Sequence, residues 1–205
     1  MRIKAIILDL DNTIYPVPSI GAQLFGPLFD LIEQSGQYKG ELAIIKGDIM
    51  RRPFQWVARE YRFSPGLTEQ STKLLRNLSY DGPMKTFEDY AYVRKLPCQK
   101  YLVTTGFTKM QQAKIDRLGI RGDFEEVFVV DPDTSDQTKK DIFQKILKDY
   151  HYKPNEVVVI GDDPKSELQA AEDLGIAAVQ YKHHGGLVEN INTISSFKEL
   201  QRFLD

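Results

Sequence analysis

The sequence has very little cysteine: Cys98 is the single one among 205 residues, so no disulfide can form within the chain. This scarcity is typical of a reducing compartment, and we expect a cytoplasmic location. Long hydrophobic runs are also missing, which excludes a bilayer-spanning helix and predicts no membrane partner. A strand-like segment begins at residue 3, which leaves no room for a signal peptide.

The sequence also lacks a strong excess of positive or of negative charge. The 27 Lys and Arg residues face 29 Asp and Glu residues, for a formal net charge of -2. Without a basic field, a nucleic-acid polymer is not an expected partner. The length fits one compact domain or a core with an inserted lid, and the composition fits both a monomer and a homodimer.

Short apolar runs alternate with helical patterns in the first and last parts of the chain. The runs occupy residues 3–8, 101–104, 127–130, 157–160 and, more weakly, 177–180. Helices are expected at residues 109–118, 139–150, 166–174 and 197–204. This alternation predicts an α/β fold, a Rossmann-like parallel sheet with helices on both faces.

The middle of the chain has a different pattern. Helical periodicity covers residues 22–34, 42–50, 53–61, 68–78 and 86–95, and no strand pattern is evident there. The simplest interpretation is an all-helical domain inserted after the first strand. We therefore predict a core domain of residues 1–15 and 97–205 and an inserted helical domain of residues 16–96.

Polar side chains follow several of the predicted strands. Asp9 and Asp11 come directly after the first strand, Thr104 ends the second, and Asp162 and Asp163 follow the fourth. Taken alone, Asp9 and Asp11 could be two solvated turn aspartates. Ligand sites in open parallel sheets lie beyond the carboxyl ends of the strands, however, so these side chains are expected to converge.

Lys139 and Lys140 add positive charge at the start of the helix after the third strand. Phosphoryl transfer needs a nucleophile, a divalent metal on carboxylates and fixed positive charge. The acidic residues alone would repel a phosphate dianion unless a cation intervened, and oxygen ligands suit magnesium. The pattern therefore predicts a Mg2+ cofactor.

Together these motifs resemble those of the haloacid dehalogenase-like hydrolase superfamily. Its Asp-x-Asp-x-Thr motif matches Asp9, Asp11 and Thr13. The threonine, lysine and Gly-Asp motifs match Thr104, Lys139 or Lys140, and the segment at residues 161–163 with Glu167. The stretch at residues 9–16, followed by a helical insert, is similar to the pyrimidine 5'-nucleotidase-like branch.

The resemblance implies a helical-cap phosphatase in which residues 16–96 form the cap. Asp9 would attack phosphorus, form an aspartyl-phosphate and bind magnesium. Asp11 would protonate the leaving oxygen, then deprotonate the hydrolytic water, with its backbone carbonyl on the metal. Thr104 and a lysine would hold the phosphoryl oxygens, while Asp162 and Asp163 would complete the metal site.

Three positions leave alternatives open. Thr105 stands where the family commonly has Asn; Thr105 and the following Gly106 are expected to bind substrate. Glu167 stands where a second Asp is common, and its longer side chain is expected to act only without touching the metal directly, or through Asp163. Lys139, four residues before Phe143, is the preferred catalytic lysine, with Lys140 as an additional substrate-binding candidate or a solvated helix residue.

The expected activity is hydrolysis of a small phosphorylated metabolite, a nucleotide or a sugar phosphate. A sugar phosphomutase and a non-catalytic phosphate-binding regulatory protein are the alternatives. Asp11 argues against a dehalogenase, because relatives of that kind lack this aspartate.

The predicted cap carries basic and aromatic residues of undecided role. Arg51, Arg52 and Trp56 would stack on a base or bind a second phosphate, or else Trp56 packs in the cap core with the arginines in water. The latter is the preferred interpretation. His183 and His184 are expected in a surface loop, with metal coordination as the alternative.

Overall fold

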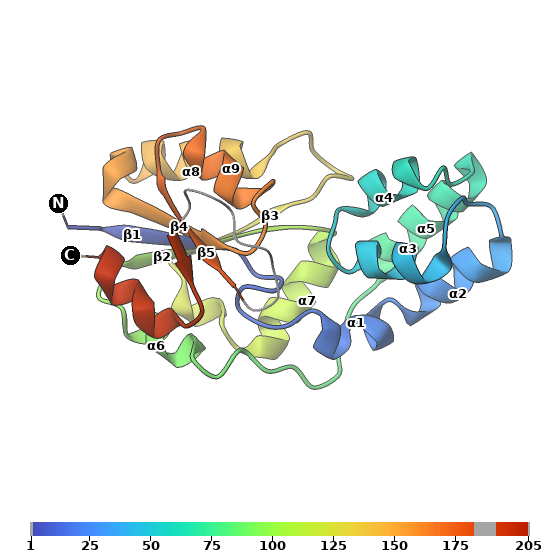
Figure 1. The fold of residues 1–205 in the computed structure, drawn as a ribbon, viewed down its shortest axis with the longest axis horizontal. Coiled ribbons are helices and arrows are strands. Elements are labelled where there is room, and N and C mark those ends of the chain that lie inside the picture. The colour runs from blue at the N-terminus through green and yellow to red at the C-terminus, as the bar shows by residue number, and fades with distance from the viewer. Residues whose placement is uncertain (1, 183–191, 205) are drawn as a thin grey trace.

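The computed structural model describes residues 2–182 and 192–204, which contain a six-stranded parallel sheet (Figure 1). The strand order is β3-β2-β1-β4-β5-β6. The strands are β1 (Ala5–Leu8), β2 (Gln99–Thr105), β3 (Glu126–Val130), β4 (Val157–Gly161), β5 (Ala177–Tyr181) and β6 (Asn192–Ile194). The five predicted strands are confirmed, and the short edge strand β6 is an addition to them.

Helices cover both faces of the sheet, as predicted. Figure 1 shows α8 (Lys139–Asp149) and α9 (Glu167–Glu172) on one face, and α7 (Thr108–Leu118) and α6 (Tyr90–Lys95) on the other. Successive side chains of a strand point to opposite faces. Ile6 and Leu8 of β1 accordingly pack into one hydrophobic core, and Ala5 and Ile7 pack into the other.

The first strand lies at the centre of the sheet, where the chain order reverses. Leu8 of β1 lies opposite Leu102 of β2 on one side and opposite Ile160 of β4 on the other. β3 then follows outward from β2, while β5 and β6 follow outward from β4. Open α/β sheets bind ligands at such a reversal, in the crevice that lies beyond the carboxyl ends of the strands.

Only helices occur between β1 and β2 within the described part of the chain. Ahead of α6 they are α1 (Pro18–Leu24), α2 (Gly26–Ser35), α3 (Leu42–Ile49), α4 (Phe54–Glu60) and α5 (Pro65–Asn77). Figure 1 shows α2 to α5 gathered beyond the carboxyl end of β1, with both termini at the opposite end of the molecule. That this helical group works as a cap stays a prediction.

Some helix bounds differ from those expected. The single helix predicted for residues 22–34 is two helices, because Pro27 lacks a backbone N–H and lies in the first turn of α2, which begins at Gly26, instead of continuing α1. The helix predicted for residues 86–95 begins only at Tyr90. The one predicted for residues 197–204 is a 3-10 helix, Phe197–Phe203, and shorter 3-10 turns cover Arg121–Asp123 and Pro154–Glu156.

The preferred interpretation of Trp56 is wrong. Its side chain is 56% exposed instead of packed in a helical core, since Phe54, Val57 and Ala58 form the buried face of α4. Arg52 is engaged locally, with its guanidinium 3.0 Å from Asp48 Oδ2. His183 and His184 lie outside the described residues. No helix in the described ranges is both long and apolar enough to cross a membrane.

Candidate active site

Asp9 directly follows the carboxyl end of the central strand β1, where sheets of this kind bind ligands. Its backbone N–H donates a 3.0 Å hydrogen bond to the carbonyl of Ile160, which continues the pairing of β1 with β4 by one residue. The residue is 5% exposed. The strand ladder therefore fixes the backbone of Asp9 and leaves its carboxylate to the crevice.

Lys139 reaches that carboxylate from the first turn of α8. Thr138 caps this helix with its hydroxyl, while the Asp141 carboxylate accepts the Thr138 backbone N–H at 2.7 Å, a reciprocal capping box. Lys139 Nζ lies 2.6 Å from Asp9 Oδ1 and 2.6 Å from Glu167 Oε2. Burial lowers the pKa of Lys139, but the two carboxylates outweigh it and raise this pKa above its ordinary value.

Lys140, the other candidate, lies apart from Asp9. Its ammonium pairs with the Asp173 carboxylate at 2.9 Å, and its side chain is 42% exposed. Adjacent positions on a helix point about 100° apart, so one lysine of the pair faces the crevice and the other faces solvent. The geometry gives no support to the substrate-binding role expected for Lys140.

Three carboxyl groups come together at the carboxyl ends of β1 and β4. One oxygen each from Asp9, Asp162 and Glu167 lie within 4.8 Å of one another. Burial, aided by Glu167 and Asp11 and opposed by Lys139, raises the pKa of Asp9 to about 7. Burial and the neighbouring Asp9 and Glu167 raise the pKa of Asp162 to about 8. This oxygen-rich donor set fits Mg2+.

Glu167 takes the position in this cluster that was expected of Asp163. The Asp163 carboxylate instead accepts the backbone N–H of Lys165 at 2.8 Å. The Asp163 backbone N–H donates to Glu167 Oε1 at 2.8 Å, which helps to hold the glutamate in place. A Cβ at Gly161 would collide with Glu167 Oε1, so glycine there lets this side chain lie against the strand.

Asp11 makes contacts that the sequence motifs did not predict. Its Oδ1 accepts hydrogen bonds from the Tyr15 hydroxyl and from Lys114 Nζ, the latter at 2.8 Å. Its Oδ2 accepts one from Gln111 Nε2 at 2.9 Å. Burial raises the pKa of Asp11, but Lys114 and these donors more than compensate and hold it below its ordinary value. The Asp11 carboxylate is not part of the three-acid cluster.

The end of β2 brings the expected phosphate-binding segment to the same crevice. Thr104 is buried, and its Oγ1 accepts a 2.6 Å hydrogen bond from Gln111 Nε2. The Thr105 carbonyl accepts from the same amide at 3.3 Å. Gly106 donates its N–H to the Val130 carbonyl at 3.0 Å, and a Cβ there would lie 3.0 Å from the Gln111 side chain.

Asp131 is a further residue that the sequence motifs did not single out. It follows β3, and its Oδ2 accepts both the backbone N–H and the hydroxyl of Thr108, at 2.7 and 2.8 Å. These bonds satisfy donors at the start of α7, the helix that carries Gln111 and Lys114. Asp131 therefore fixes the helix from which Asp11 is contacted.

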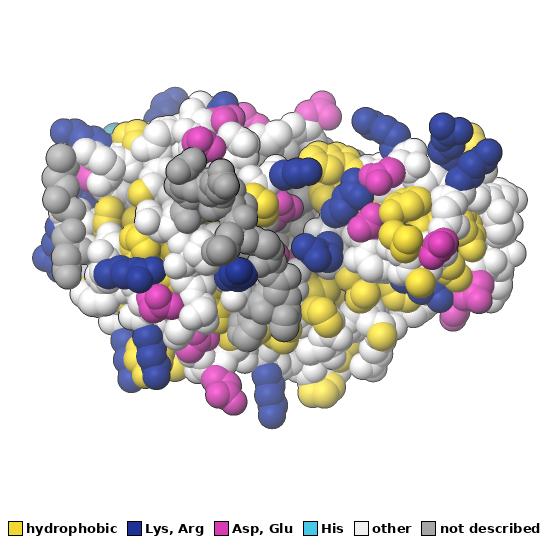
Figure 2. All heavy atoms as spheres, in the orientation of Figure 1, with side chains coloured by type: hydrophobic (Ala, Val, Ile, Leu, Met, Phe, Trp, Pro, Cys, Tyr) yellow, Lys and Arg dark blue, Asp and Glu magenta, His cyan; other side chains and the backbone are white. Residues whose placement is uncertain are grey.

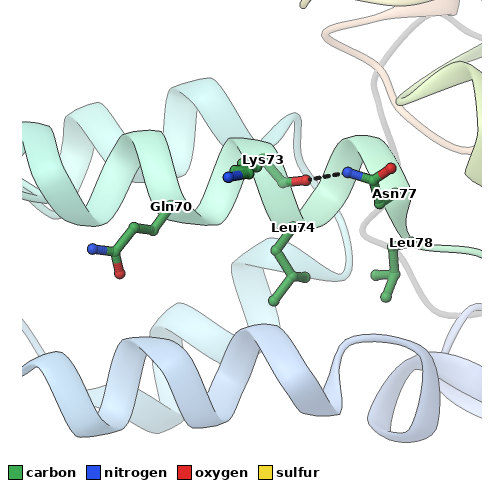
Figure 3. A pocket seen from close by; sticks show the side chains of 5 residues that line it. All are labelled: Gln70, Lys73, Leu74, Asn77 and Leu78. Carbon is green, nitrogen blue, oxygen red and sulfur yellow. Dashed lines mark hydrogen bonds between the residues drawn. The ribbon is translucent and has the colours of Figure 1, made fainter.

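The helical group presents a surface of its own. Figure 2 shows Lys and Arg side chains standing out from it beside hydrophobic side chains, and Ile44 and Trp56 are 53% and 56% exposed. A hollow on α5 is lined by Gln70, Lys73, Leu74, Asn77 and Leu78 (Figure 3). None of the predicted site residues lines this hollow, so it is separate from the crevice at Asp9.

Comparisons with known proteins identify the family of this chain. The family model described as haloacid dehalogenase-like hydrolase matches residues 3–175. A glyceraldehyde 3-phosphate phosphatase of Pyrococcus furiosus is 24% identical over 89% of this chain and 82% of its own. The enolase-phosphatase E1 of Aquifex aeolicus is 24% identical over 97% of this chain and 99% of its own.

A solved structure has the same fold. A haloacid dehalogenase-like family hydrolase from Streptococcus pneumoniae superposes with a TM-score of 0.74 over 98% of each chain, at 18% sequence identity. The resemblance read from the four sequence motifs is confirmed.

Proposed function

The chain belongs to the haloacid dehalogenase-like hydrolases, and we propose that it hydrolyses a small phosphomonoester. In this proposal Asp9 is the nucleophile and magnesium is the cofactor. The two curated relatives described above are phosphatases. The observation that carries the proposal is the contact between Asp9 and Lys139 beside Asp162 and Glu167. It joins a buried carboxylate, a cation for phosphoryl oxygens and a set of metal ligands in one place.

The charges around Asp9 favour a divalent cation. Four carboxyl groups, those of Asp9, Asp11, Asp162 and Glu167, face two ammonium groups, those of Lys114 and Lys139. Fully ionised, this set carries two negative charges too many. The raised pKa values of Asp9 and Asp162 are partly a consequence of the same excess of negative charge. Bound magnesium would neutralise it and would polarise a phosphoryl oxygen.

In the proposed reaction, a carboxylate oxygen of Asp9 forms a bond to phosphorus while the bond from phosphorus to the ester oxygen breaks. The carboxylic acid form of Asp11 gives its proton to the departing oxygen and becomes the carboxylate. A water molecule then attacks the aspartyl-phosphate, Asp11 takes its proton, and the phosphorus–Asp9 bond breaks to release phosphate. Lys139 and the Thr104 hydroxyl would stabilise the charge on the phosphoryl oxygens throughout.

The proposed substrate class is a small phosphorylated metabolite, such as a nucleotide or a sugar phosphate. The burial of Asp9 and Thr104 supports a substrate that presents a slender terminal phosphate. One relative is named for glyceraldehyde 3-phosphate, a compound of this class. The helices between residues 18 and 95 would close over the bound substrate as a cap and exclude water.

The test is phosphate release from p-nitrophenyl phosphate by the purified chain. Activity should vanish after exhaustive chelation and return when magnesium is added. Asp9→Asn keeps the shape of the side chain and removes the nucleophile, so it should be inactive in the same assay while its thermal melt shows a folded protein. Full activity of the chelated protein would exclude the metal, and an active Asp9→Asn variant would exclude the nucleophile.

A further inference from the structure

Lys114 is a buried cation that the proposed reaction does not yet use. It lies on α7, its side chain is 3% exposed, and its ammonium is 2.8 Å from Asp11 Oδ1. The same ammonium lies 5.8 Å from the centre of the Tyr15 ring. Lysine is almost never fully buried unless it is paired, so the placement of this side chain depends on Asp11.

Gln111 lies one turn before Lys114 on the same face of α7. Its Nε2 donates to Asp11 Oδ2 at 2.9 Å and to Thr104 Oγ1 at 2.6 Å, and it lies 3.3 Å from the Thr105 carbonyl oxygen. A carboxylate and a carbonyl only accept hydrogen bonds, so they fix which end of the amide faces them. One helix face thus contacts both Asp11 and Thr104.

Both oxygens of Asp11 are therefore held. Tyr15 and Lys114 donate to Oδ1, and Gln111 donates to Oδ2. Three donors on three side chains leave the carboxylate little freedom to rotate. A buried ion pair is weak evidence for stability, because taking both charges out of water offsets much of their attraction. A contribution to fold stability alone is thus a poor explanation for the presence of a buried lysine at position 114.

We propose that Lys114 is a positioning residue, which with Gln111 holds the ionised Asp11 carboxylate in the orientation in which it takes a proton from the hydrolytic water. The proposal rests on the acid–base role of Asp11 in the proposed function. Lys114 touches Asp11 and does not itself touch the reacting phosphoryl group. Its effect on the reaction therefore passes through Asp11, and it disappears when Asp11 can no longer transfer protons.

A double-mutant cycle tests this dependence. Lys114→Met and Lys114→Arg are each made in the native chain and in Asp11→Asn, and kcat and KM for p-nitrophenyl phosphate are measured with saturating magnesium. A misplaced catalytic group can cost about 10²-fold. We expect a loss of that order in kcat in the native chain, little change in KM, and less than about a twofold further loss in the Asp11→Asn background.

Folding is controlled in the same cycle. Lys114→Met leaves the charge of the Asp11 carboxylate unpaired. In the double variant Lys114→Met with Asp11→Asn, both side chains are neutral. Lys114→Arg keeps the positive charge at position 114 and changes the hydrogen-bond geometry. Should Lys114→Met not fold, the arginine variant in both backgrounds supplies the cycle. Lys145→Met is the matched control, because that exposed lysine pairs with Asp149 on the surface of α8 and should keep native kcat.

Two results overturn the proposal. One is a native kcat in a folded Lys114 variant, and the other is an equal fractional loss in the native and Asp11→Asn backgrounds, which is the outcome of a merely structural role. Neither result touches the proposed function, which is tested separately by magnesium-dependent phosphate release from the native chain and by the loss of that activity in Asp9→Asn.

Discussion

Lys139 and Asp9 are 130 positions apart in the chain, and their side chains meet at 2.6 Å. The meeting is a consequence of the parallel sheet, because the carboxyl end of β1 and the helix after β3 open onto the same edge. Glu167 shares the ammonium at the same distance, so one cation serves two carboxylates. This shared lysine organises the proposed phosphate site.

We predict unequal effects for the two adjacent lysines. Lys139→Ala removes the cation beside Asp9, and the loss of such a preorganised group should lower kcat by about 10²–10³-fold. Lys140→Ala removes only an exposed surface pair with Asp173, so its kcat should stay near the native value. Steady-state rates of the two variants, measured together with their thermal melts, test this prediction. Equal losses of kcat in both variants would contradict the assignment of the phosphate-binding role to Lys139 alone.

The acidic cluster predicts which carboxylate matters for the metal. Glu167→Gln keeps the side-chain size and removes a charge from the cluster, and it should raise the magnesium concentration for half-maximal activity by about 10–100-fold. Asp163→Asn should have a smaller effect, because its carboxylate caps the backbone N–H of Lys165. The opposite ranking would return the metal role to Asp163.

Magnesium affinity should depend on pH. Without metal, Asp9 and Asp162 hold their protons up to pH values of about 7 and about 8. A proton must leave before the carboxylate binds the metal, so affinity is highest above both values and falls as the pH is lowered through them. Calorimetric titration of magnesium into the chelated protein, at one pH below both pKa values and at one pH above both, should show weaker binding at the lower pH. Equal affinity would contradict the raised pKa values.

Asp11→Asn should distinguish good from poor leaving groups. A positioned general acid contributes about 10²–10⁴-fold, and this should be lost for an alkyl phosphate. The first step with p-nitrophenyl phosphate should suffer less, because that leaving oxygen carries charge easily. Rapid mixing should then show a burst of p-nitrophenol followed by slow turnover. Native rates for both substrates would mean that Asp11 serves only as a turn residue.

Much of the fold and part of the site could be predicted from local sequence patterns. Buried parallel strands have short apolar runs as their sequence pattern, and these runs predict β1 to β5. Because such strands end at one edge of the sheet, the topology predicts that Asp9, Thr104, Lys139 and Asp162 lie at the same edge. The three-residue strand β6 has no comparable pattern, and its membership of the sheet depends on its tertiary contact with β5.

The missed residues depend on packing that sequence patterns do not reveal. Gln111 and Lys114 are polar residues on a helix and read as solvated, yet both are buried against Asp11. Their three-residue spacing on one helix face is a signal only once a buried partner is known. Glu167 was named by its motif, but its place beside Asp9 and Asp162 depends on the turn after β4, which directs the Asp163 carboxylate to the backbone N–H of Lys165. Residue spacing does not predict that local rotation.

The covalent step on Asp9 is the central claim, and trapping it is the most direct measurement. The native chain, mixed with magnesium and p-nitrophenyl phosphate, is quenched in acid during turnover and digested, and its peptides are weighed by mass spectrometry. We predict one added phosphoryl group on the peptide that contains Asp9, and none in Asp9→Asn treated in the same way. A phosphorylated residue elsewhere, or sustained turnover by the Asp9→Asn variant, would contradict the account.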